Sequence, residues 1–124
     1  MRSIKGFTLI ELLVVMSIIA LLLTIAMPRY FNSVDTAKEA ALRQDLALIR
    51  DALDKHYSDN GKYPDSLQDL VNRHYLRTIP PDPITDSIAS WKIVAPSDTA
   101  KGAVYSIKSG APGKAKDGTL YSEW

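Results

Sequence analysis

The chain has 124 residues, of which 15 are Lys or Arg and 14 are Asp or Glu, and its formal net charge is +1. Because the basic residues form no one-signed stripe, nucleic acid is not expected as a partner. The sequence contains no cysteine, which excludes disulfides, thiolate zinc sites and a cysteine nucleophile. The first quarter is almost wholly apolar, so roughly ninety residues remain to build one small water-soluble core.

A long apolar segment follows the basic start of the chain. The 21 residues from Phe7 to Met27 contain one charged side chain. As a helix they would be about 31 Å long, which matches the roughly 30 Å hydrocarbon thickness of a bilayer. Arg2 and Lys5 precede the segment, and the positive-inside tendency places that end in the cytoplasm. We therefore expect a single membrane span.

Two simpler explanations compete for this segment. A secretory signal peptide would place a small-x-small cleavage site after the apolar run, and Pro28-Arg29-Tyr30 does not match one. A plain membrane anchor fits the length and the composition. It gives no reason, however, for the acidic residue near the start of the segment.

That residue, Glu11, is the most informative one in the chain. A carboxylate in a spanning segment costs on the order of 3 kcal/mol unless it is paired or protonated. No Lys, Arg or His lies between Phe7 and Met27, so the partner must come from elsewhere. A cut between Gly6 and Phe7 would create an amino group about one helical turn from Glu11 of the same copy or of a neighbouring one.

The residues Lys5-Gly6-Phe7-Thr8-Leu9-Ile10-Glu11-Leu12 resemble the prepilin cleavage motif shared by type IV pilins and type II secretion pseudopilins. The resemblance implies cleavage after Gly6 by a membrane-embedded prepilin peptidase and N-methylation of Phe7. It also implies that Glu11 pairs with the new amine of an adjacent subunit during assembly. Pro28 matches a proline that bends the helix in this family, although it could equally mark only the membrane exit.

The second quarter of the chain has the periodicity of an amphipathic helix. Between Asp35 and Tyr57, apolar residues recur at spacings of three and four, at Leu42, Leu46, Ile49, Leu53 and Tyr57. Asp59-Asn60-Gly61 predicts its C-terminal end. Ser66 predicts the start of a short helix that ends near His74.

The last third of the chain predicts a small sheet. Ile79-Pro80-Pro81-Asp82-Pro83 lacks the amide donors of a central strand and is expected to be a rigid loop. Segments 91–95 and 103–108 predict neighbouring antiparallel strands, and 119–122 a short third strand. Tyr57, Tyr63, Tyr75, Trp91 and Tyr105 are expected in the core, and His56 and His74 at the surface. The expected fold class is α+β, with a long N-terminal helix, hydrophobic in its first half and amphipathic in its second, packed on a small C-terminal antiparallel sheet.

This arrangement resembles the major pseudopilin of type II secretion. The resemblance implies a cleaved leader at 1–6, a hydrophobic membrane and assembly helix at 7–28, and a periplasmic pilin-like domain at 29–124. Because many type IV pilins close a C-terminal loop with a disulfide, the lack of cysteine favours a pseudopilin.

Major pseudopilins commonly bind calcium in the C-terminal loop. By this resemblance, Asp86, Asp98, Asp117 and Glu123 are the candidate oxygen ligands. The competing explanation is that Asp117-Gly118 forms an ordinary turn and binds no calcium.

The function expected from these features is structural, and no residue pattern indicates an enzyme. The chain would polymerise through its N-terminal helix into a periplasmic filament that drives protein export. The resemblance implies as partners the prepilin peptidase, minor pseudopilins, an inner-membrane platform with its ATPase, a secretin and membrane lipid. Two alternatives stay open: a type IV pilin or minor pilin for adhesion, motility or DNA uptake, and a monomeric membrane-anchored calcium-binding domain.

Overall fold

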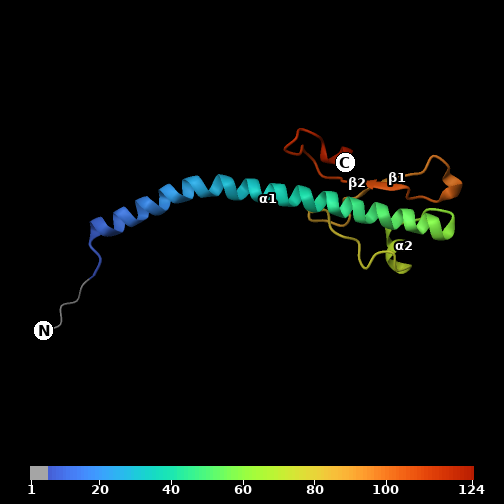
Figure 1. Ribbon diagram of the computed structural model, residues 1–124, viewed down its shortest axis with the longest axis horizontal. Helices are drawn as coiled ribbons and strands as arrows, with labels where there is room; N and C mark the ends of the chain where they lie inside the picture. Colours follow the sequence, from blue (N-terminus) through green and yellow to red (C-terminus); the bar gives the residue numbers. More distant parts are fainter. Residues whose placement is uncertain (1–5) are drawn as a thin grey trace. The chain divides into compact units, whose positions relative to one another are not determined.

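The computed structural model describes residues 6–124, so Arg2 and Lys5 lie outside the described residues. The chain separates into two units, one ending at Asp35 and the other spanning Thr36–Trp124. A single helix, α1, runs from Leu9 to Asn60, 52 residues in all (Figure 1). This confirms the predicted long helix with an apolar half and an amphipathic half.

Pro28 lies inside α1 and does not end it. A proline has no N–H, so the carbonyl of Thr24 loses its usual partner one turn later. The Thr24 hydroxyl bonds to the carbonyl of Ala20 at 2.8 Å, and the Ser17 hydroxyl bonds to that of Leu13 at 2.8 Å. The hydroxyls of Ser17 and Thr24 are thus satisfied within the helix.

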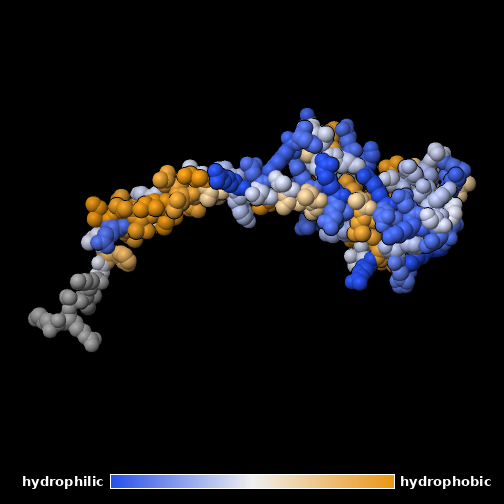
Figure 2. Space-filling model, viewed as in Figure 1, coloured by the Kyte–Doolittle hydropathy of each residue, from blue (hydrophilic) through white to orange (hydrophobic). Residues whose placement is uncertain are grey.

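The first unit has no core of its own. Every described residue from Gly6 to Ser33 is exposed. Figure 2 shows the first half of α1 as a continuous apolar surface. An exposed apolar surface of this extent needs a cover from another molecule, such as lipid or a protein partner.

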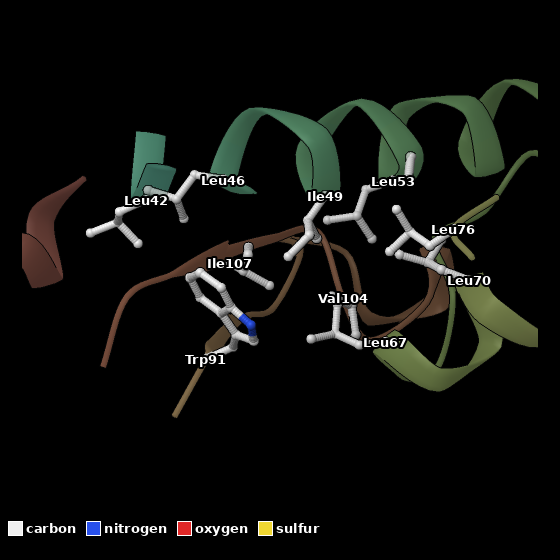
Figure 3. Packing of buried hydrophobic residues seen from close by; sticks show 11 residues of the cluster. Leu42, Leu46, Ile49, Leu53, Leu67, Leu70, Leu76, Trp91, Val104 and Ile107 are labelled. Atoms are coloured by element: carbon white, nitrogen blue, oxygen red, sulfur yellow. The ribbon is translucent and has the colours of Figure 1, made fainter. Parts of the chain in front are cut away.

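The second unit contains the hydrophobic core, to which α1 contributes one face (Figure 3). The predicted apolar positions Leu42, Leu46, Ile49 and Leu53 are all buried. A short helix, α2 (Leu67–Asn72), begins at Ser66, whose side chain accepts the Asp69 N–H at 3.3 Å. The rest of the cluster consists of Ala52, Leu67, Leu70, Leu76, Trp91, Val104 and Ile107.

The sheet has two antiparallel strands, β1 (Lys92–Val94) and β2 (Ser106–Lys108), with Ile93 opposite Ile107. A 3-10 turn, η1 (Thr99–Lys101), lies between them. Together with the long helix, this confirms the α+β pilin-like fold. The predicted third strand is wrong, because Tyr121–Glu123 forms a 3-10 helix, η2, preceded by one isolated bridge between Lys114 and Leu120. Tyr121 and Trp124 instead contact α1, through Glu39 and Arg43.

The predicted surface position of His56 is also wrong. Its side chain is 2% exposed, and it follows Leu53 by three residues on the buried face of α1. Nδ1 lies 2.8 Å from the carbonyl oxygen of Lys62, so it must carry the proton and donate. The ring is 5.4 Å from that of Tyr75. His56 therefore ties the chain just after α1 back to the helix.

The predicted aromatic core is only partly confirmed. Trp91 is buried, and its indole N–H donates to the carbonyl of Pro80 at 2.8 Å. Tyr105 is 50% exposed and packs its ring edge against Tyr63 at 5.3 Å. Tyr63 in turn lies 4.6 Å from Tyr57. These tyrosines form a surface cluster beside the core.

Asp82 is a fully buried acid within the predicted rigid loop. One carboxylate oxygen accepts the N–H of Ile84 at 2.8 Å, and the other accepts the hydroxyl of Ser109. The carboxylate thus holds the turn from Asp82 to Ser87 and connects it to the end of β2. A buried charge of this kind is stable only because its oxygens are hydrogen-bonded.

Gly102 generates a prediction about stability. It has φ +110° and ψ −169°, a region used almost only by glycine, and an added Cβ would lie 2.2 Å from the Tyr63 carbonyl oxygen. We expect Gly102→Ala to destabilise the domain by about 3 kcal/mol or more. The measurement is thermal unfolding of the full-length protein in detergent, followed by the near-UV signal of its tryptophans.

Gly61→Ala is the matched control. Gly61 has φ +71°, and nothing lies within 4 Å of its added Cβ. Only backbone strain of about 1 kcal/mol is therefore expected. Equal losses for the two variants would contradict the steric argument.

Asp45 generates a prediction about pH. Partial burial, and then the charge of Asp82, raise the pKa of its carboxyl above the ordinary 3.8. A raised carboxyl pKa lowers the stability of the folded protein wherever Asp45 is ionised, and the cost disappears below pH 3.8. We expect Asp45→Asn to raise the unfolding temperature at pH 7 and to have no effect below pH 3.8.

The control for this variant is Asp51→Asn. Asp51 is exposed and pairs with Lys55 at 3.0 Å, so its loss is expected to lower stability slightly at pH 7. A gain for Asp45→Asn that did not change with pH would contradict the electrostatic origin.

Candidate functional site

The candidate assembly site begins where α1 begins. Gly6, Phe7 and Thr8 are not helical, and Thr8 caps the helix. Its hydroxyl oxygen accepts the N–H of Glu11 at 3.2 Å, and its carbonyl accepts the N–H of Leu12 at 3.1 Å. Thr8 and Glu11 have the Thr-x-x-Glu spacing of a capping box, which is a sequence signal for the start of a helix. The predictions from sequence did not include this helix start.

Glu11 lies in the first turn of α1, among apolar side chains. It borders a shallow groove with Phe7, Ile10, Val14 and Val15. The unpaired N–H groups at the start of a helix carry partial positive charge, which lowers the cost of a carboxylate there. Among residues 6–124, Glu11 forms no ion pair. The helix start therefore compensates the charge of Glu11 only in part.

The side chains around Glu11 are those of a membrane segment. Phe7 is 84% exposed and Leu9 is 82% exposed. Within residues 6–124, α1 is the one helix that is both long enough and apolar enough to cross a membrane. None of its most apolar stretch is buried. A signal sequence passes the same test of length and composition. The combination with Glu11 is what sets this segment apart.

The apolar half of α1 ends in a polar and aromatic boundary. Arg29 follows Pro28, and the rings of Tyr30 and Phe31 pack edge to face at 5.8 Å. Both rings are exposed. Aromatic rings and a cation at the end of an apolar helix are typical of a membrane–water interface.

Two of the four candidate calcium ligands lie in separate turns. Asp86 has φ +56° and lies in the turn held by Asp82, whose carbonyl accepts its N–H at 2.7 Å. Asp98 caps η1, its carboxylate accepting the N–H of Ala100 at 3.0 Å. Each acid thus has a local role in its own turn.

The other two lie near the end of the chain. The Asp117 carboxylate accepts the hydroxyl of Thr119 at 2.6 Å and its N–H at 3.0 Å, and these bonds lower the pKa of Asp117 below its ordinary value. Glu123 belongs to η2. Across the part of the chain that the structure describes, no three His, Cys, Asp or Glu side chains converge to hold a metal ion.

Comparison with known proteins gives two kinds of match. Residues 1–27 match the family model for the prokaryotic N-terminal methylation motif. The chain is 31% identical to the type II secretion system core protein G of Pseudomonas aeruginosa, over 91% of this chain and 87% of that one. It is 27% identical to the core protein G of Klebsiella michiganensis, over 94% and 92% of the two chains.

A relative from a third organism shows the same full-length similarity. The core protein G of Vibrio cholerae is 27% identical over 92% of this chain and 85% of its own. No solved structure gives a significant match. Since the methylation motif and the full-length similarity agree, the chain belongs to the family of type II secretion system core protein G, the major pseudopilins.

Proposed function

We propose that this pseudopilin is cut after Gly6 and polymerises through α1, with Glu11 of one copy pairing with the freed Phe7 amine of the next. The filament is a structural part of the type II secretion machinery. The observation that carries the proposal is the position of Glu11, a carboxylate in the first turn of an exposed apolar helix.

The energetics favour a partner from another copy. An unpaired carboxylate in lipid costs on the order of 3 kcal/mol, and the partial charge at a helix start offsets typically 0.3–1 kcal/mol. A free amine at Phe7 would carry a similar cost in lipid. Pairing the two removes both costs at once, and pairing them between copies fixes the axial offset of neighbouring helices.

The proposed location is the bacterial inner membrane, with the leader in the cytoplasm and residues 29–124 in the periplasm. Arg2 and Lys5 supply the orientation signal. Arg29 and Tyr30 would then lie at the periplasmic interface. After assembly the filament would extend into the periplasm.

The proposed partners follow from this location. They are the prepilin peptidase, minor pseudopilins, the inner-membrane platform with its assembly ATPase, and the secretin. The named relatives are type II secretion proteins, so neither a type IV pilin nor a monomeric calcium-binding anchor is favoured.

Gly6 allows processing to be tested apart from folding. Nothing lies within 4 Å of an added Cβ there, so Gly6→Val has no steric cost in the folded chain. A side chain at the cleavage point should crowd the extended backbone in a protease cleft. We expect wild-type protein to begin at Phe7 with one added methyl group and Gly6→Val to keep residues 1–6, as measured by intact mass.

Ser3→Ala serves as the processing control, because it changes the leader without changing the residue at the cut. It should be processed like wild type. Recovery of wild-type protein from assembled filaments with residues 1–6 still attached would contradict the proposal.

Glu11 tests assembly directly. Glu11→Ala and the isosteric Glu11→Gln both leave the Phe7 amine of a neighbour unpaired in lipid, so we expect each to reduce polymer by about tenfold or more. The measurement is the fraction of the protein recovered in sheared filaments, together with release of exported protein. Ser17→Ala removes a hydroxyl bond from the same helix without removing charge and should assemble normally.

Co-expression distinguishes pairing between copies from pairing within one copy. A Glu11→Ala subunit keeps its amine but offers no carboxylate to the next copy, so it should enter wild-type filaments and shorten them. Normal processing and wild-type filament yield for Glu11→Gln would show that the charge pair is not needed.

A further inference from the structure

The last eleven residues, 114–124, are held against one face of α1. Four polar side chains of the helix contact this C-terminal segment: Thr36, Glu39, Arg43 and Arg50. Their spacings of three, four and seven place them in one stripe. All of these contacts lie within the unit Thr36–Trp124.

Lys116 makes the first contact through both its side chain and its backbone. Its ammonium donates to the hydroxyl oxygen of Thr36 at 2.7 Å, and its N–H donates to a carboxylate oxygen of Glu39 at 3.0 Å. The hydroxyl of Tyr121 donates to the same Glu39 oxygen at 3.0 Å. Glu39 of α1 thus binds both ends of the turn at 116–121, and the Lys116 ammonium adds a bond to Thr36 at the first end.

Arg43 makes the second contact. Its guanidinium carbon lies 3.8 Å from the centre of the Trp124 ring, a cation–π arrangement, and a terminal nitrogen lies 3.5 Å from Asp117. Both charged side chains of the pair are more than half exposed, so solvent screens it and it contributes little alone. The ring of Trp124 also packs edge to face on Tyr121 at 5.2 Å.

Arg50 makes the third and strongest contact. It donates to the carbonyl of Ile107 at 2.9 Å, to the hydroxyl of Ser106 at 3.3 Å and to the carbonyl of Trp124. These acceptors belong to β2 and to the end of the described chain. One half-buried guanidinium therefore joins α1, the sheet and the C-terminal segment, which a point charge on a lysine could not do.

We infer that the C-terminal segment is fixed by the chain's own cations, Lys116, Arg43 and Arg50, and that its folding does not depend on calcium. The family resemblance implied a calcium loop here, but the residues present do not fit one. Asp117 is occupied by Thr119 and faces Arg43, and no three carboxylates converge among the described residues. A divalent cation would also meet the ammonium and guanidinium charges already in place.

Hydrogen exchange on the full-length protein in detergent tests this inference. In wild type, amides 115–121 should exchange at rates that change less than about twofold on adding millimolar calcium chloride or EDTA. Arg50→Gln keeps a hydrogen-bond donor but loses the positive charge and the several N–H donors of the guanidinium group. In this variant, exchange at 115–121 should accelerate by about tenfold or more. Amides of the α1 core at 46–53 should stay protected.

Two further variants keep the test decisive if Arg50→Gln unfolds the whole domain. Lys116→Gln changes an exposed side chain and should accelerate exchange at 115–121 without calcium rescue. Lys114→Gln removes a neighbouring exposed charge and should leave exchange unchanged. A saturable slowing of exchange by calcium that magnesium does not reproduce would overturn the inference, as would wild-type exchange in Lys116→Gln. The inference is independent of the proposed processing and of Glu11.

Discussion

The structure depends on one constraint: the first half of α1 is an apolar helix whose side chains are exposed among the described residues 6–124. Its side chains from Phe7 to Phe31 are exposed, including its leucines, isoleucines and valines. Water cannot solvate such a surface without a large free-energy cost. Lipid covers it in the membrane, and other copies can cover it in a filament. The apolar half of α1 therefore needs contacts with other molecules to be stable.

The second half of the same helix is covered on one face by its own chain. From Leu42 onward, one face is buried by a core that the chain supplies itself, with Leu70, Val104 and Ile107 fully enclosed. The helix is continuous through Pro28, and the hydroxyls of Ser17 and Thr24 are bonded to carbonyls of the helix, so neither hydroxyl needs water along the apolar half. A folded domain and an uncovered span therefore coexist in one element.

The elements with local signals were predictable from the sequence. Leucine spacing predicted the buried face of α1, and Ser66 predicted the start of α2. Long-range contacts decided what could not be predicted. Residues 119–122 have strand-like composition, but Tyr121 bonds to Glu39, 82 positions away, and forms a 3-10 turn. His56 and Asp82 are buried because Lys62 and Ser109 supply partners, and no local pattern indicates such partners.

Glu11 could be singled out as a candidate for a related reason. Glu11 conflicts with its local environment, and such a conflict is visible in sequence without any knowledge of the fold. The two ends of the chain then differ in where their charges are neutralised. Glu39 and Asp117 find donors within their own unit, as the inferred calcium-independent folding of the C-terminal segment requires. Within residues 6–124, Glu11 finds only the partial charge of a helix start, so a cation from another molecule would stabilise it further. Under the proposed pairing, an acid whose partner lies in another copy would link stability to assembly, and the information for polymerisation would lie in the N-terminal helix.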